Sequence, residues 1–131
     1  MQIRAIVADD FEKLFSFWQI NYFVSEMDSK EHFLLFLEKN PNLSILAEED
    51  GEIIGTALGS YDGRRGYLQK VVASKEVRKK GIGKRLVEEV INRLKIAGAL
   101  YVPVSIEEEL IPFYEKCGFI KKDLHSMSLD L

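Results

Sequence analysis

Apolar residues along the chain repeat with a period of two in some segments and of about 3.6 in others, which indicates strands interleaved with helices. The period-two segments predict strands at 2–7, 43–49, 52–60, 67–73, 99–104 and, as a final pair, within 119–131. Asp50-Gly51 is a typical turn between the second and third of these strands.

The helical spacing predicts four helices. The first is capped by Asp9 or Asp10, the second begins at 28–31, the third spans Gly81 to Ala97, and a short one lies at about 107–116. The first strands follow one another directly, whereas later strands alternate with helices. This order predicts a mixed α/β layer fold whose sheet is antiparallel in its N-terminal part and parallel in its C-terminal part.

Length and composition narrow the class of protein. The 131 residues predict a single domain, 1–131, and 47% apolar with 30% charged residues is ordinary for a globular protein. A net charge of −3 argues against a nucleic-acid-binding module. One cysteine, Cys117, allows no internal disulfide, and His32 and His125 belong to no ligand set with metal spacing, so no metal site is predicted. Without an apolar run of about 20 residues or a secretory signal, we expect a cytoplasmic protein that does not bind membranes.

The most informative segment runs from strand to loop to helix at 71–85. Gly81 and Gly83 stand at the helix entry, where unpaired N–H groups and the helix dipole suit a phosphate. Within it, the eight residues 78–85 contain five cations and no acid: Arg78, Lys79, Lys80, Lys84 and Arg85. The spacing of the glycines fits neither a Walker A loop nor a dinucleotide-binding GxGxxG motif. The simpler alternative to a phosphate site is a helix whose basic N-terminal end is only solvated.

Two motifs carry a resemblance to a known family. Arg78-Lys79-Lys80-Gly81-Ile82-Gly83 resembles the R-x-x-G-x-G/A signature of the GNAT (Gcn5-related N-acetyltransferase) acyltransferases, and FYEKCGF (113–119) resembles their F-Y-x-x-x-G-F element. The separation and the predicted elements agree with that family over essentially the whole chain. Residues 60–67 and Val102-Pro103 further resemble its YpeA-type bacterial branch.

The resemblance implies the GNAT fold: one mixed, mostly antiparallel sheet of six to seven strands flanked by about four helices. In that fold two parallel strands, here 67–73 and 99–104, splay apart to admit the cofactor. Pro103 fits such a break because it cannot donate a ladder hydrogen bond, although a simple strand end explains it equally well.

The resemblance also implies an N-acyltransferase that uses acetyl-CoA and a primary amine, which attacks the thioester directly. Tyr114 matches the tyrosine that hydrogen-bonds the departing sulfur. The strand positions Val71, Val72 and Ala73 would hold the pantetheine arm and polarise the thioester carbonyl. The pyrophosphate would be held by the backbone N–H groups of Arg78, Lys79, Lys80, Gly81, Ile82, Gly83 and Lys84.

Some features stay open or depart from the family pattern. Glu48, Glu49 and Asp62 are the carboxylates nearest by topology, but none is assigned as the base. The family's asparagine before the Phe-Tyr pair is absent, since Ile106 and Glu107 stand there. An acyl-CoA-binding sensor without turnover is therefore the alternative function. Dimers are common in the resembled family, but no sequence feature defines an interface, and the acceptor is not identified.

A cluster of early aromatic residues lies near the end of the first predicted helix. Trp18, Tyr22 and Phe23 fall in the region that borders the acceptor site in the resembled family. At helical spacing, such residues are more often part of a core than of a pocket.

Overall fold

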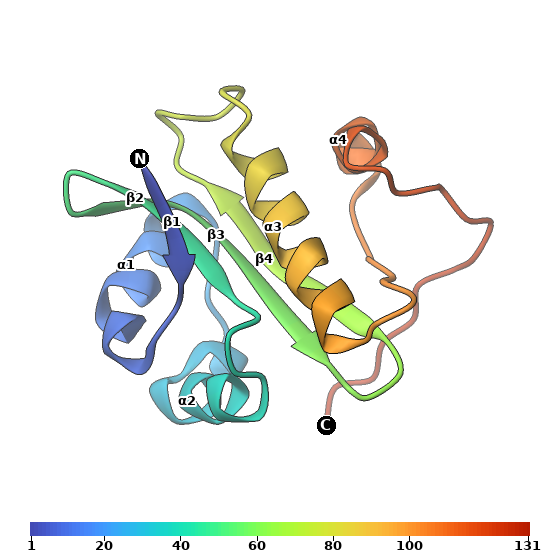
Figure 1. Ribbon diagram of the computed structural model, residues 1–131, viewed down its shortest axis with the longest axis horizontal. Helices are drawn as coiled ribbons and strands as arrows, with labels where there is room; N and C mark the ends of the chain where they lie inside the picture. Colours follow the sequence, from blue (N-terminus) through green and yellow to red (C-terminus); the bar gives the residue numbers. More distant parts are fainter.

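A four-stranded antiparallel sheet lies at the centre of the computed structural model, which describes residues 1–131 (Figure 1). The strands follow one another across the sheet in chain order and are β1 (Gln2–Ala5), β2 (Ile45–Glu49), β3 (Glu52–Tyr61) and β4 (Gly66–Ala73). Every neighbouring pair is antiparallel. β1 and β4 are therefore the edge strands, and the C-terminal part of the chain lies on the β4 side (Figure 1).

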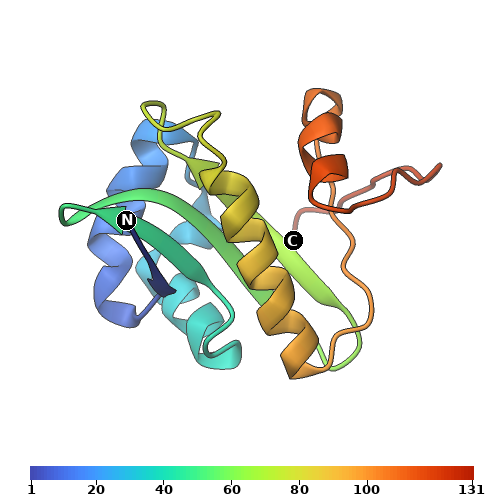
Figure 2. The ribbon, with the colours of Figure 1, turned by 45° about the horizontal axis from the view of Figure 1, so that its top comes forward.

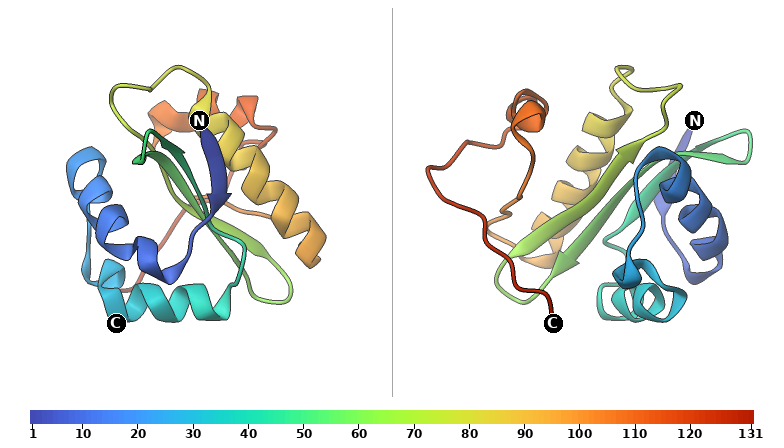
Figure 3. Two further views of the ribbon diagram at one scale, coloured as in Figure 1. Left: turned by 60° about the vertical axis from the view of Figure 1, so that its left-hand side comes forward. Right: turned by 180° about the vertical axis from the view of Figure 1, so that it is seen from behind.

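Helices cover both faces of the sheet. α1 (Phe11–Asn21) and α2 (Lys30–Lys39) lie on one face, and α3 (Ile82–Ala97) crosses the other (Figure 3). α4 (Ile111–Lys116) lies beside the N-terminal end of α3 (Figure 2). Three single turns of 3-10 helix are η1 (Ala8–Asp10), η2 (Glu26–Asp28) and η3 (Glu108–Leu110). None of the helices combines the length and apolar character that a membrane crossing needs.

The four predicted helices are confirmed, and local signals explain where they begin and end. Ser29 caps α2, since its hydroxyl accepts the N–H of His32 (3.3 Å). α3 ends at Gly98, which has φ 116°. Pro112 lies in the first turn of α4, where a missing N–H costs no helical hydrogen bond.

The sheet separates two hydrophobic cores because successive strand residues point to opposite faces. Ile45 and Ala47 pack toward α3, whereas Leu46 between them packs toward α1 and α2. The first core lies between the sheet and α3 and contains the buried residues of that helix, Ile82, Leu86, Val87, Val90 and Leu94. The second core lies between the sheet and the N-terminal helices and is rich in their aromatic side chains. The amphipathic spacing of the sequence thus determines which side of each helix faces the sheet.

Glycines in β3 make room for α3. A Cβ on Gly59 would lie 2.5 Å from the carbonyl oxygen of Leu43 and 2.8 Å from a methyl carbon of Val90. A Cβ on Gly55 would lie 2.7 Å from a methyl carbon of Leu86. These distances leave no room for any other residue. Gly55 and Gly59 therefore allow α3 to pack directly on the sheet.

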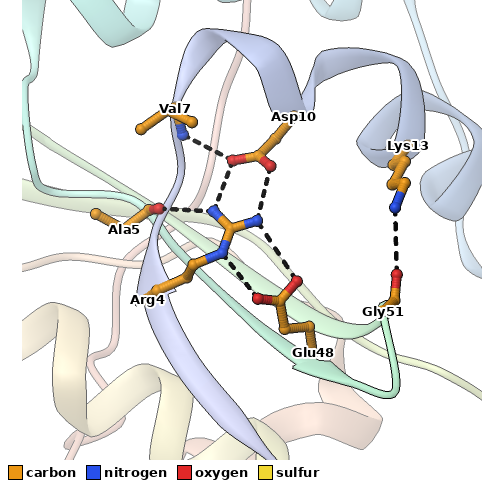
Figure 4. Close-up of polar contacts among 7 residues, drawn as sticks. All are labelled: Arg4, Ala5, Val7, Asp10, Lys13, Glu48 and Gly51. Carbon is orange, nitrogen blue, oxygen red and sulfur yellow. Dashed lines mark hydrogen bonds and ion pairs between the residues drawn. The ribbon is translucent and has the colours of Figure 1, made fainter.

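An ion-pair network joins β1 to β2 and to the first helical turn (Figure 4). Arg4 donates to both carboxylate oxygens of Asp10 (2.9 and 2.8 Å) and, through Nε, to Glu48 (3.0 Å). Asp10 also accepts the N–H of Val7 (2.8 Å). The side chains of Arg4, Asp10 and Glu48 are all less than one-third exposed, so solvent screens the network only in part.

Two predicted strand regions do not form strands. Only one main-chain hydrogen bond joins 99–104 to the sheet, from the N–H of Gly66 to the carbonyl of Tyr101 (2.9 Å), and Pro103 has no N–H to extend such a ladder. Within 119–131 Phe119 packs against the core, but the apolar side chains beyond it are exposed, with values of 76% to 92% at Ile120, Leu124, Met127 and Leu129.

The mixed α/β class with its four helices is confirmed, but the sheet has four strands rather than six or seven. The predicted parallel pair of 67–73 and 99–104 is absent. Strand pairing depends on the partner strand as well as on the period-two pattern, which explains why the pattern was insufficient at the C-terminal end.

Candidate functional site

The loop between β4 and α3 contains the R-x-x-G-x-G motif. Gly81 is the N-cap of α3 and has φ 80°, a left-handed conformation that favours glycine, and Lys79 is also left-handed, with φ 73°. Lys80 donates its N–H to the carbonyl of Val77 (3.2 Å). The other N–H groups of the motif donate no hydrogen bond within the chain: those of Arg78, Lys79, Gly81, Ile82, Gly83 and Lys84. Free donors at the positive end of a helix dipole suit an anion.

The cationic side chains of this loop divide into two groups. Arg78 is bound within the protein, donating from Nε to the carbonyl of Ala73 (3.2 Å) and from a terminal nitrogen to the carbonyl of Asn21 (3.0 Å). It thereby ties the loop to the ends of β4 and α1. The second group consists of exposed side chains that form no ion pair: Lys75, Lys79 and Lys80 in the loop, and Lys84 and Arg85 in the first turn of α3.

Gly83 brings the two sequence motifs into contact. A Cβ on this residue would lie 3.3 Å from two ring carbons of Phe113, closer than ordinary van der Waals contact. The absence of a side chain at Gly83 thus lets α4 pack against the first turn of α3 (Figure 2). The contact of the Gly83 N–H with pyrophosphate stays a prediction, and the structure adds a packing role for the same residue.

Tyr114 lies in α4 with its ring buried and only 8% of the residue exposed. Its ring packs edge-on against Phe113 and Phe119, with centroids 5.0 and 5.4 Å apart. Burial raises the pKa of Tyr114 to about 12, so the phenol is neutral at pH 7. Burial also raises the pKa of the neighbouring Cys117 thiol, which disfavours the nucleophilic thiolate, as expected for a packing residue.

A cavity of about 470 Å³ lies between β4, the end of α1 and the segment leading to α4. Val71 and Tyr114 both line it, so the fold brings these two predicted site residues together. Its other polar or charged lining residues are Tyr22, Gln69, Lys70, Ser105, Glu107 and Ser126. Among these, the family resemblance points only to Tyr22, near the acceptor site, and to the position of Glu107. These lining residues come from four separate parts of the chain, and only the tertiary fold makes them neighbours.

The remaining predicted strand residues do not line this cavity. Val72 is buried in the core toward α1, and Ala73 contributes its carbonyl oxygen to Arg78. Both residues are paired with β3, opposite Thr56 and Gly55.

A bulge in β4 shapes the strand where it meets the cavity. Lys70 and Val71 fall between the paired positions Gln69 and Val72, and Lys70 is left-handed with φ 49°. A buried polar relay holds this bulge, since the indole N–H of Trp18 donates to the Thr56 hydroxyl (3.0 Å), which donates to the carbonyl of Lys70 (2.9 Å).

The carboxylates considered as bases from the sequence do not line the cavity. Glu48 is bound to Arg4. Asp62 caps its own turn by accepting two backbone N–H groups, both at 2.7 Å, and these bonds lower its pKa. The carboxylate on the cavity wall is Glu107, at the position where the family asparagine is missing.

Comparison with known proteins concerns the sequence family and the fold of the chain. Residues 5–119 match the sequence model of the acetyltransferase (GNAT) family. Glucosamine-6-phosphate N-acetyltransferase from Arabidopsis thaliana is 23% identical with a TM-score of 0.76, over 98% of this chain and 97% of that one.

Two further solved structures have the same fold. A predicted acetyltransferase from Clostridium acetobutylicum, solved with acetyl-CoA, is 20% identical with a TM-score of 0.78, over 98% of this chain and 95% of that one. PaiA N-acetyltransferase from Thermoplasma acidophilum, solved with coenzyme A, is 22% identical with a TM-score of 0.78, over 95% and 92%. At these identities the likeness concerns the fold.

Proposed function

The protein belongs to the acetyltransferase (GNAT) family, and from this premise we propose that it transfers an acetyl group from acetyl-CoA to a primary amine. The observation that carries the proposal is the pairing of two features at one end of the sheet. One is the row of free N–H groups before α3, and the other is the adjacent cavity lined by Val71 and Tyr114.

The loop before α3 fits the pyrophosphate of acetyl-CoA. Its free N–H groups lie at the helix N-terminus, and the exposed cations beside them add positive charge and form no ion pair within the chain. Arg78 holds this loop in place through its two backbone contacts. The solved acetyltransferases with acetyl-CoA or coenzyme A support this choice of ligand.

The cavity fits the acyl-transfer step. Acetyl-CoA supplies an activated thioester, and a neutral amine attacks its carbonyl carbon directly. We assign Val71, Val72 and Ala73 to the pantetheine arm and the thioester. Val71 has no partner in the β3–β4 register, which favours a main-chain contact to a ligand at the bulge.

Tyr114 is assigned as the hydrogen-bond donor to the departing sulfur. Its pKa of about 12 keeps the phenol protonated throughout the neutral range. Because a thiol has a pKa of about 8.5, full proton transfer from this phenol to the thiolate is uphill by about 5 kcal/mol. The tyrosine therefore stabilises the charge that develops on sulfur and keeps most of its own proton.

Titration calorimetry with acetyl-CoA tests the donor assignment. We expect the unaltered protein to bind, and Lys84→Glu to weaken binding about tenfold or more, since it reverses a charge beside the bound pyrophosphate. Lys95→Glu makes the same charge change at the other end of α3 and is the matched control. The donor assignment is wrong if acetyl-CoA fails to bind, or if both variants bind it equally well.

Release of free CoA in the presence of a polyamine, a lysine peptide or an amino sugar then tests turnover. Acetylation of any of these amines supports the enzyme. Tight binding of acetyl-CoA without turnover on any amine favours the alternative, a module that binds acyl-CoA and does not catalyse transfer.

A further inference from the structure

Lys70, at the bulge of β4, has a largely covered side chain, and the proposed reaction has not used it. Its side chain is only 11% exposed, and lysine is almost never buried unless its ammonium is paired. Its partners come mainly from residues 22–29, the 22–29 loop, which joins α1 to α2.

The ammonium of Lys70 is surrounded on several sides. Nζ lies 3.0 Å from a carboxylate oxygen of Asp28 and donates to the carbonyl of Phe23 (2.7 Å). It also lies over three aromatic rings, 4.7 Å from the centroid of Phe23, 5.1 Å from Tyr22 and 5.2 Å from Trp18. All of these groups except Trp18 belong to the 22–29 loop.

Asp28 connects this ion pair to the shape of the loop. Its side chain is 10% exposed, and the oxygen that faces Lys70 also accepts the N–H of Ser25 (2.8 Å), which closes the turn of η2. Removing one partner of a buried ion pair leaves the other charge unpaired, which is strongly unfavourable.

Apolar burial holds only part of the same loop. Val24 is partly buried against the second core, but Tyr22, Phe23 and Met27 are each more than half exposed. The ion pair and the hydrogen bond of Lys70 are the polar links between this loop and the sheet.

The position of the loop matters for the cavity. Tyr22 and Lys70 line the cavity together with Val71 and Tyr114. In the function proposed above, the donor is held by Val71, Tyr114 and the loop before α3. Tyr22 and Lys70 form one wall of the remaining cavity, and the polar residues on its other side are Ser105, Glu107 and Ser126.

We propose that Lys70 is a positioning residue that fixes the 22–29 loop as the amine-facing wall of the cavity. The proposal rests on the function proposed above for the role of that wall, but the fastening of the loop is independent of it. Lys70 acts through Asp28, Tyr22 and Phe23 and has no bond-making role.

Hydrogen exchange by mass spectrometry tests the fastening. In Lys70→Met we expect the amides of the 22–29 loop to exchange about tenfold faster or more, with α3 unchanged. Lys70→Arg keeps the charge and restores most of the protection. Lys39→Met, at an exposed lysine of α2, behaves like the unaltered protein. Should Lys70→Met not fold, Asp28→Asn removes the same ion pair and is expected to give the same pattern.

Equal acceleration in the loop and in α3 would mean a general loss of stability and would overturn the proposal. So would a loop whose exchange does not change. The emission of Trp18, the single tryptophan, gives a second readout because the Lys70 ammonium lies over its ring.

Steady-state kinetics test the role of the wall, with the best amine among the polyamine, the lysine peptide and the amino sugar. We expect Lys70→Met to raise the KM for the amine about tenfold, while the Kd for acetyl-CoA changes by less than about twofold. An unchanged KM in a variant with a loosened loop overturns the amine-facing role. Failure of acetyl-CoA to bind the unaltered protein instead overturns the proposed function and leaves the exchange result valid.

Discussion

At the scale of single residues, Tyr114 has both a buried ring and a place on the wall of the cavity. Edge-on contacts with Phe113 and Phe119 hold the ring, and burial holds the phenol in its neutral form. A neutral phenol can donate a hydrogen bond and carries no charge that would repel a developing thiolate. Replacing Tyr114 should therefore impair catalysis while leaving the binding of acetyl-CoA largely unchanged.

Replacing Tyr114 by Phe is expected to lower kcat by about 10- to 100-fold, because one hydrogen bond to the departing sulfur is lost. The Kd for acetyl-CoA should change by less than about twofold, since that bond strengthens only as charge develops. The measurements are steady-state kinetics and calorimetry on the same preparation. An unchanged kcat would exclude the proposed role of Tyr114.

The pH–rate profile of the unaltered protein gives an independent check on Tyr114. The phenol is neutral below its pKa of about 12 and ionises above it. Ionisation of Tyr114 should therefore not affect activity between pH 7 and pH 10. Any loss of activity in that range should occur equally in the unaltered protein and in Tyr114→Phe. A falling limb in that range that does disappear in the variant would mean that Tyr114 ionises near its ordinary pKa.

At the scale of elements, β1 is a short edge strand that is held by ion pairs as well as by its backbone hydrogen bonds to β2. Arg4 joins it to Asp10 on η1 and to Glu48 on β2 (Figure 4). The hydrogen bonds from Arg4 lower the pKa of Asp10 below its ordinary value of 3.8. The carboxylate is therefore stabilised in the folded protein relative to the unfolded chain.

The sign of this effect predicts how Asp10 contributes to stability. The contribution is fully present above pH 3.8, where the unfolded chain also carries the charge, and is lost as the pH falls through the lower pKa of the folded protein. At pH 7 we expect Asp10→Asn to lower the free energy of unfolding by about 1–3 kcal/mol. Urea unfolding at pH 7 and pH 3 checks this expectation, because the difference between variant and parent should shrink at pH 3. A difference independent of pH would contradict it.

At the scale of the whole molecule, the two cores and the C-terminal segment differ sharply in packing. Both faces of the sheet are covered by helices, whereas residues 120–131 are all exposed. The side-chain hydrogen bond from this segment joins Ser126 to Ser105 (3.1 Å). Most of the stability therefore comes from the segment before residue 120.

Deleting residues 121–131 is expected to change the free energy of unfolding by less than about 1 kcal/mol, since exposed side chains contribute little. Chemical denaturation of the shortened and full-length chains measures the difference. A much larger loss would mean that the segment packs in solution, and the open edge of β4 is where it would pair.

Local sequence patterns were sufficient to predict most of the helices and strands. Helical spacing with Ser29 and Gly98 at helix ends predicted α2 and α3, and period-two alternation predicted β1 to β4, because these signals act within a few residues of one another. The two motifs likewise identified the family, since their residues are contiguous. At 99–104 and 119–131 the same alternation predicted strands that do not form, because a strand also needs a partner edge.

The tertiary structure alone decided what surrounds the candidate site. Gly83 makes room for Phe113, Arg78 holds the loop before α3, and Lys70 reaches the 22–29 loop through Asp28. Each of these contacts joins residues far apart in the chain, and the physical reason is the same in each case. A side chain finds such a partner only after the sheet has brought distant segments together, so its role depends on a neighbour that no local pattern can specify.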